Sequence, residues 1–236
     1  MDTCKKRGTF KRIKMKTDKL IKLFRYALGL PKSIYVNFRL LPFKQAVFLP
    51  IIVSTNTKLI SLSGKATLKK VKTGIVRIGF TGADMIDFNS NPTMLQVCGT
   101  INFNGKVKIA KGSRIVVYGE LSLGDNFITT GCSTIICAKN ISIGNNTMLA
   151  WESIIMDTDQ HKIFDKEKKH INQDDKVTIG NDVWIGARSF VLKNSTIKDG
   201  CIVGANTTVS KSFDAKESII VGNPPRVIKN SVTWQH

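Results

Sequence analysis

The feature that most constrains this chain is a spacing of six residues. In three stretches, every sixth residue is aliphatic or aromatic. A period of six fits neither the 3.6 residues of a helix turn nor the two-residue alternation of a strand. It fits a chain wound as a triangular prism, in which each side is one short strand followed by a corner, with apolar side chains stacked inside. The three series run from Val97 to Phe127, from Ile143 to Ile155, and from Ile179 to Val209, with a weaker continuation through Ala215 to Val221.

This pattern predicts an all-β fold, a parallel β-helix with about 18 residues in each three-sided rung. Residues 97–221 would form the coil, with a change of phase around residues 131–139. Residues 34–96 show no clean period and are interpreted as an irregular β lead-in or as imperfect first rungs. Residues 222–236 would form a C-terminal tail that begins at Gly222-Asn223-Pro224-Pro225.

The formal net charge of +19 is unevenly distributed along the chain. Residues 1–50 hold 13 Lys and Arg against 2 Asp, whereas residues 157–236 hold 12 against 10 Asp and Glu. A nucleic-acid-binding fold concentrates its cations on the folded face that binds. Here the excess marks a terminal segment, and only three Tyr and three Trp are available for stacking on bases. We therefore expect no nucleic-acid partner.

The first 33 residues are interpreted as a basic arm followed by a short amphipathic helix. Apolar residues between Asp18 and Leu28 recur at helical spacing, and Gly29-Leu30-Pro31 is expected to end the helix. One interpretation is a solvated arm with a helix packed on the coil or on a neighbour. The other is peripheral contact of residues 1–30 with an anionic membrane surface.

Cysteine usage and hydropathy indicate the compartment. The five cysteines are odd in number and form no CxxC pair, so neither a disulfide framework nor a structural zinc site is expected. The most apolar stretch, residues 34–53, contains two cations and two prolines and does not predict a transmembrane span. The N-terminus lacks the pattern of a signal peptide. We expect a cytoplasmic protein. The alternative prediction is a cytoplasmic protein that is attached peripherally to the inner face of the membrane.

The six-residue series is interrupted by the polar and charged residues 157–176, which predict a loop extruded from one corner of the coil. His161 lies where this loop leaves the coil, whereas His170 lies inside it and His236 is the last residue. An imidazole suits proton transfer near neutral pH, which makes His161 the candidate base. Asp157 and Asp159 would either orient His161, bind acceptor hydroxyls, or only solvate the loop.

Several motifs taken together resemble the hexapeptide-repeat acyltransferases, which are left-handed β-helix enzymes that move an acetyl group from acetyl-CoA. The resemblance covers residues 141–229 and rests on the ladder, the loop with its histidine, Val183-Trp184-Ile185-Gly186 and Gly222-Asn223-Pro224. The Asp-Thr-Asp-x-His form at residues 157–161, with Leu49-Pro50-Ile51 and Gly64-Lys65 upstream, is most similar to the branch acting in capsule and lipopolysaccharide synthesis.

The resemblance implies a homotrimer with sites between subunits, acetyl-CoA as donor, no metal, and direct O-acetylation of a sugar hydroxyl in a surface polysaccharide or its precursor. His161 would be the general base, and the Ala187 N–H would bind the oxyanion. Two departures stand out: Gly131 replaces an acceptor-binding Asn, and Pro225 replaces Ala. The implied contacts to the donor come from Trp184, Gly186, Ala187, Gly204 and Ala205, and from Lys211, Arg226 and Lys229 for its phosphates.

Other functions remain open from the sequence. N-acetylation of an amino sugar uses the same chemistry, and its amide product would resist base, unlike an ester. A non-catalytic β-helix scaffold would lack affinity for CoA. A γ-type carbonic anhydrase shares the coil but needs three zinc-binding histidines, and only His161 and His170 lie within the predicted fold.

Overall fold

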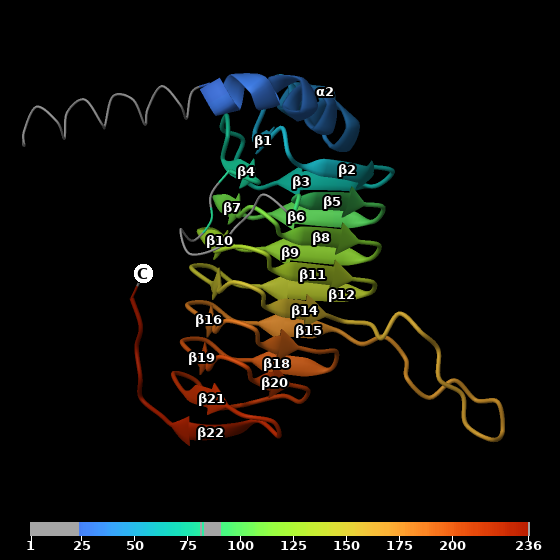
Figure 1. Cartoon of the computed structure of the whole chain (residues 1–236), viewed down its shortest axis with the longest axis vertical. Helices are drawn as coiled ribbons and strands as arrows, with labels where there is room; N and C mark the ends of the chain where they lie inside the picture. Colours follow the sequence, from blue (N-terminus) through green and yellow to red (C-terminus); the bar gives the residue numbers. More distant parts are fainter. Residues whose placement is uncertain (1–23, 81, 83–90, 236) are drawn as a thin grey trace, which may run out of the picture.

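The computed structural model describes residues 24–80, 82 and 91–235, which form a left-handed parallel β-helix of three sheets (Figure 1). Sheet A contains β1 (Ile51–Val53), β4 (Val76–Ile78), β7 (Val107–Ile109), β10 (Phe127–Thr129), β13 (Met148–Leu149), β16 (Trp184–Ile185), β19 (Ile202–Val203), β21 (Ile219–Val221) and the antiparallel β22 (Arg226–Lys229). Sheet B contains β2 (Lys58–Ser61), β5 (Met94–Val97), β8 (Arg114–Val117), β11 (Thr134–Cys137), β14 (Ile154–Met156), β17 (Phe190–Val191) and β20 (Thr208–Val209). Sheet C contains β3 (Lys65–Leu68), β6 (Thr100–Phe103), β9 (Glu120–Leu123), β12 (Asn140–Ile143), β15 (Val177–Ile179) and β18 (Ser195–Ile197).

From β1 to β20 the chain passes in turn from sheet A to sheet B to sheet C, so the coil has three corners, here named A–B, B–C and C–A. The predicted apolar series line its interior. Every member from Val97 to Phe127, from Ile143 to Ile155 and from Ile179 to Val209 is at most 2% exposed. The continuation to Val221 is wrong by one residue. Val203 pairs with Ile220, which is buried, while Val221 is half-buried, because the last rung is one residue shorter.

The change of phase comes from a change in rung length. Leu121 pairs with Ile141, twenty residues further on, whereas Val177 pairs with Ser195 after eighteen. The longer rungs give sheet B strands of four residues, as in β8 and β11, while the later β17 and β20 have two. Eighteen residues are three steps of six, but twenty are not. The two extra residues in each long rung therefore shift the inward-facing positions, and the series that starts at Ile143 has a different phase from the series that starts at Val97.

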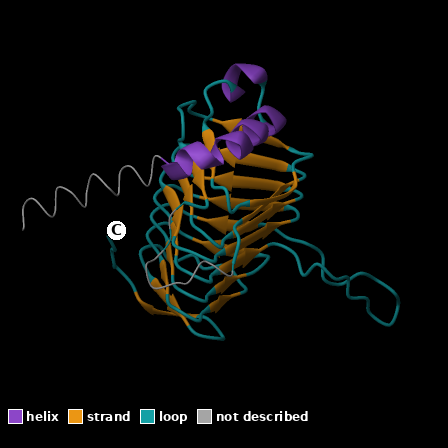
Figure 2. Cartoon of the chain, turned by 45° about the horizontal axis from the view of Figure 1, so that its top comes forward, coloured by secondary structure: helices purple, strands orange, loops and turns teal. Residues whose placement is uncertain are grey.

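A helix closes the N-terminal end of the coil, followed by the short α2 (Phe43–Ala46) (Figure 2). Residues 24–40 are helical, so the predicted stop at Gly29-Leu30-Pro31 is wrong. Contacts with the first rung outweigh the weak helical preference of these residues. Asn37 accepts a hydrogen bond from the Ile51 N–H at 3.1 Å and donates one to the Ile51 carbonyl at 2.6 Å. The Ser33 hydroxyl accepts from the Val53 N–H at 2.9 Å.

Close approach of the helix to the coil explains the glycine at position 29. A Cβ atom there would overlap the carbonyl oxygen of Val53, so only glycine permits this packing. Lys32 adds hydrogen bonds to the carbonyl oxygens of Thr55 and Thr57. The helix therefore covers backbone groups at the start of sheet A that would otherwise be open to pairing with another chain. The part of the predicted arm before residue 24 lies outside the described residues.

Candidate functional site

Residues 157–176 leave the coil at the B–C corner, between β14 and β15, and project away from it as a narrow arm (Figure 1). The arm folds back on itself. Phe164 and His170 form an antiparallel bridge, and the Ile171 N–H donates to the Ile163 carbonyl at 2.9 Å. The Asp165 carboxylate accepts the Lys169 N–H at 2.8 Å and so closes the tip. The predicted loop is therefore an ordered hairpin-like arm.

Asp157 anchors the base of this arm inside the protein. Its side chain is fully buried, and its two oxygens accept the backbone N–H groups of Ala138, Lys139 and Asn140 at 2.6, 2.9 and 2.7 Å. Ala138 and Lys139 form the B–C corner of the preceding rung, the last of the long rungs, and Asn140 begins β12 directly after it. A carboxylate that accepts three N–H groups is held firmly in place. Asp157 thus fixes the corner from which the arm starts, and it makes no described contact with the His161 ring.

Asp159 forms the neck of the arm together with two residues that the sequence did not single out. Its carboxylate accepts hydrogen bonds from Lys193 Nζ at 2.6 Å and from Asn172 Nδ2 at 2.8 Å. The hydrogen bond from Lys193, reinforced by the one from Asn172, lowers the pKa of Asp159 below its ordinary value. Asn172 Nδ2 also donates to the His161 carbonyl at 2.8 Å. Lys193, Asp159 and Asn172 therefore determine the backbone position of His161.

Rung arithmetic could have identified Lys193. Eighteen residues separate paired positions in this part of the coil, and Lys193 lies eighteen residues after Asp175, at the end of the arm. The side chain of His161 is exposed, and within the described part of the chain neither Asp157 nor Asp159 contacts its ring. His170, by contrast, hydrogen-bonds Asn172 through Nε2 at 3.0 Å and lies 5.6 Å from the Phe164 ring.

Trp184 lies on sheet A, the face opposite the B–C corner, and points outward from β16. Its ring lies 6.0 Å from that of Trp234, a C-terminal residue that the sequence did not single out. The indole of Trp234 donates to the Asp182 carbonyl at 2.6 Å, which holds the tail beside β16. Together the two rings form an apolar surface with Trp184 still 36% exposed.

The remaining predicted backbone contacts stack at the A–B corner. Gly186-Ala187 and Gly204-Ala205 occupy this corner in successive rungs, and a Cβ on Gly186 would lie 2.6 Å from the Val203 carbonyl oxygen. Glycine is therefore required for the rungs to stack. The Ala187 carbonyl accepts the Asn206 N–H at 3.0 Å, while the Ala187 N–H has no acceptor among the described residues. This N–H is thus available to a ligand.

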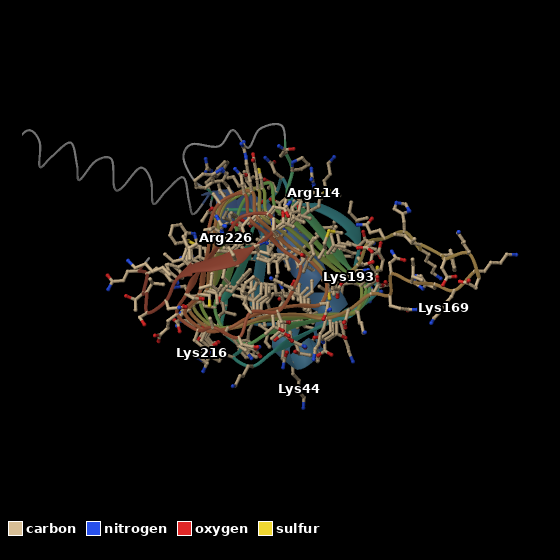
Figure 3. The ribbon with its side chains drawn as sticks, turned by 90° about the horizontal axis from the view of Figure 1, so that it is seen from below. Lys44, Arg114, Lys169, Lys193, Lys216 and Arg226 are labelled. Carbon is tan, nitrogen blue, oxygen red and sulfur yellow. The ribbon has the colours of Figure 1, made fainter. Side chains whose placement is uncertain are left out.

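The three cations predicted to bind phosphates lie on two sides of the coil. Lys211 follows β20 at the B–C corner, where it lies over the Phe213 ring at 5.5 Å. Arg226 and Lys229 are exposed on β22 of sheet A. The view along the coil shows Arg226 on the face away from Lys193, which marks the corner that carries the arm (Figure 3). One chain therefore does not bring these three cations together.

Two buried cysteines near these elements are not suited to be nucleophiles. Burial, with a further contribution from the Asp157 charge, raises the pKa of the Cys137 thiol to about 12. Cys137 and Cys201 each donate to a backbone carbonyl at 3.2 Å, those of Glu120 and Ala215. The thiolate is the reactive form of cysteine. Both side chains are therefore part of the core.

Comparison with known proteins gives one family match and several relatives. The model of the bacterial transferase hexapeptide (six repeats) matches residues 176–211. A 24.8 kDa uncharacterized protein in the cps region of Klebsiella pneumoniae is 30% identical over 85% of this chain and 88% of its own length. A polysialic acid O-acetyltransferase of Escherichia coli O1:K1 is 27% identical over 57% of this chain, and one of Neisseria meningitidis is 37% identical over 43%. The chain spans 43% and 47% of the length of these two acetyltransferases.

Proposed function

The chain belongs to the hexapeptide-repeat transferase family and is an acyltransferase, and we propose that it moves an acetyl group from acetyl-CoA to a sugar hydroxyl. The main support for the proposal is where the predicted site residues lie on the coil. The exposed His161 lies at the B–C corner, whereas Trp184 and the Ala187 N–H lie on sheet A and at the A–B corner. The parts of a site are present in each chain but face different directions, so two copies are needed to complete it.

We place the B–C corner of one copy against sheet A of the next, in a closed ring of three copies. The arm supports this arrangement because it carries apolar side chains that a single chain leaves in solvent. Ile163, Phe164 and Ile171 are each more than half exposed. A neighbouring copy would remove these side chains from water, and the gain would hold the arm in one position.

The same arrangement would gather the donor-binding groups. Lys211 of one copy and Arg226 with Lys229 of its neighbour would face the same groove and supply cations for the phosphates of CoA. The rings of Trp184 and Trp234 would line the path of the pantetheine arm. The thioester would then reach the stacked A–B corner, where Gly186 and Gly204 keep the backbone accessible.

The chemistry follows from these positions. The His161 imidazole accepts the proton of the sugar hydroxyl as its oxygen attacks the thioester carbonyl carbon. The resulting oxyanion accepts a hydrogen bond from the Ala187 N–H. Collapse of the tetrahedral intermediate breaks the carbon–sulfur bond, and the imidazolium returns its proton to the CoA sulfur. Cys137, beside the base of the arm, is buried and has a pKa of about 12, so it is not suited to carry the acetyl group as an intermediate.

The two aspartates have different roles in this proposal. Asp159, through Asn172 and with Lys193, is a positioning residue that sets the backbone of His161. Asp157 holds the corner beneath the arm and does not act on substrate. Because neither Asp157 nor Asp159 contacts the His161 ring among the described residues of one chain, we infer that the neighbouring copy or the acceptor orients the ring.

We further propose that the acceptor belongs to a surface polysaccharide or its precursor. The relatives named as polysialic acid O-acetyltransferases and the relative in the cps region support this choice. The product distinguishes the two forms of transfer, since an acetyl ester is removed by mild base and an amide is not. Incubation with acetyl-CoA and a panel of oligosaccharides, followed by mass spectrometry before and after base treatment, identifies both acceptor and linkage.

The experiment that tests the role of His161 compares two substitutions in the same arm. His161→Ala should lower the rate of acetyl transfer by a hundredfold to ten-thousandfold, the usual contribution of a general base. Its affinity for CoA should remain within twofold. His170→Ala removes a histidine that contacts Phe164 and Asn172, and it should keep activity within a few-fold. Full activity of His161→Ala would refute the assignment.

A further inference from the structure

The helix that closes the coil has a large apolar face that nothing in the described chain covers. Its buried side holds Gly29, Ser33, Val36 and Leu40, which contact the first rung. The opposite side carries side chains that are exposed and mostly aromatic. This outer face, here called the cap face, consists of Phe24, Leu28, Ile34, Tyr35 and Phe38 of the helix with Phe43, Val47 and Phe48 of the turn that follows.

The cap face is continuous across the helix and α2. The rings of Phe38 and Phe43 lie 5.8 Å apart, and they join the last turns of the helix to α2. Phe43 is 72% exposed and Phe24 is 64% exposed, values unusual for side chains of this size. A helix that is apolar on both of its sides is normally buried on both. The cap face is therefore expected to have a partner.

Charge determines which partner is suitable. Residues 24–80 contain ten Lys and Arg and no Asp or Glu, and residues 1–23 add nine Lys and Arg against two Asp. Arg25, Arg39 and Lys44 are exposed beside the cap face. Two copies joined through this end would bring two strongly cationic surfaces together, and the basic residues 1–23 would add to the same repulsion. An anionic surface, in contrast, satisfies both the apolar and the cationic groups.

We propose that the cap face docks the protein on an anionic lipid surface, with the helix lying in the plane of the headgroups. Aromatic side chains flanked by cations are the pattern of helices that lie at this interface. Within the described residues, no helix is both long enough and apolar enough to cross a membrane. The contact surface differs from the one expected from the sequence, because it extends from residue 24 through Phe48 in α2 and the turn after it.

Docking through the cap face would orient the whole coil. The helix lies across the end of the coil, so the rungs would descend from the lipid surface (Figure 2). Sheet B takes four strand steps from β2 to β14, where the arm begins. At about 4.8 Å for each step, the arm would stand about 19 Å below the first rung. If the proposed function is right, docking would hold the acetyl-transfer site at a fixed distance from the membrane surface.

Co-sedimentation of the full chain with vesicles tests the proposal. The wild-type protein should sediment with vesicles of phosphatidylcholine that contain 30% phosphatidylglycerol, and not with phosphatidylcholine alone. Phe38→Ser/Phe43→Ser should weaken this binding at least tenfold, because it removes two aromatic rings of the cap face. Both rings are exposed in the free protein, so their loss should spare the fold. Arg39→Glu/Lys44→Glu should weaken it by a similar factor, and 0.5 M NaCl should do the same to the wild type.

Matched substitutions at the other end of the coil serve as controls. Ile228→Ser replaces a side chain of similar exposure on β22, and Lys216→Glu reverses an exposed cation. Both should bind vesicles as the wild type does. Equal binding to neutral and anionic vesicles, or no binding, would overturn the proposal. So would a self-association, measured by sedimentation equilibrium, that is lost in Phe38→Ser/Phe43→Ser, since a second copy would then cover the cap face. The readout requires no acetyl transfer, so it fails or succeeds independently of the enzymatic proposal.

Discussion

Lys193 Nζ lies 2.6 Å from Asp159 Oδ2 and joins the rung below the arm to the neck of the arm. The Lys193 side chain is only 22% exposed, so this ion pair is partly shielded from water. Lys193 Nζ also donates a hydrogen bond to the Asn172 carbonyl at 2.9 Å. The pair therefore ties the backbone of His161 to the rigid coil rather than leaving the arm free to move.

Removal of this tie should affect turnover more than donor binding. We expect Lys193→Met to lower kcat ten- to hundredfold while the KM for acetyl-CoA stays within twofold, because a small displacement of a catalytic group is costly. Lys193→Arg should recover most of the activity. Lys216→Met, an exposed cation elsewhere on the coil, serves as the control. A purely structural role for Lys193 would instead lower stability and leave kcat of the folded enzyme unchanged.

The same pair should make the arm sensitive to acid. The pKa of Asp159 lies below its ordinary value because of the hydrogen bond from Lys193 and then that from Asn172. The stabilisation is therefore complete above the ordinary Asp value of about 3.9 and is lost as the pH falls through the lowered pKa. Hydrogen exchange of residues 157–176, corrected for intrinsic rates, should show less protection at pH 3 than at pH 5. Lys193→Met should show low protection at both values, and a wild-type-like difference in this variant would contradict the assignment.

We predict that Asp157 contributes to the stability of the fold and not to catalysis. Asp157→Ala leaves three partly buried backbone N–H groups without their acceptor and should reduce the free energy of unfolding by about 1–3 kcal/mol. Urea unfolding followed by circular dichroism measures this loss. Asp165→Ala, which removes a carboxylate that caps the exposed tip of the arm, should cost far less. Loss of activity in Asp157→Ala with unchanged stability would show that this carboxylate acts on substrate.

Asn37 should protect the open end of the coil. Asn37→Leu would leave the N–H and carbonyl of Ile51 buried without partners and should cost about 2–4 kcal/mol of unfolding free energy. We also expect concentration-dependent aggregation, since the unpaired N–H and carbonyl of Ile51 could form hydrogen bonds with a strand of another chain. Light scattering during thermal unfolding detects this. Arg39→Ala on the same helix is the control. If both variants had the same unfolding free energy and the same aggregation, Asn37 would not protect the end of the coil.

The interior of the coil could be predicted from sequence because each rung repeats one requirement. A residue that points inward every six positions must be apolar, and residues such as Ile115 and Val191 therefore show the period directly. The register could not be followed where rung length changes. The step from Val203 to Ile220 is one residue shorter than the step before it, from Ile185 to Val203, and nothing in the local pattern marks it.

The N-terminal helix shows how tertiary contacts override local signals. Pro31 lacks an N–H and Gly29 has low helix propensity, so the local pattern predicts an end. Gly29 is instead required where the helix touches Val53, and Ser33 with Asn37 gains hydrogen bonds to the first rung. The residues of the candidate site could be named from the sequence, and the family resemblance implied that the site lies between subunits. The structure places His161 at the B–C corner and Trp184 on sheet A, and we propose that a second copy brings them together.

Mixing of two inactive variants tests this shared site most directly. His161→Ala keeps the donor-binding face intact, and Trp184→Glu keeps the arm intact while placing a negative charge beside the expected path of the donor. Trimers assembled from equal amounts of both chains should recover about a quarter of the wild-type rate, because one site in four pairs an intact arm with an intact face. Each variant alone should stay inactive. A mixture as inactive as its parts would place the whole site within one chain and contradict this account.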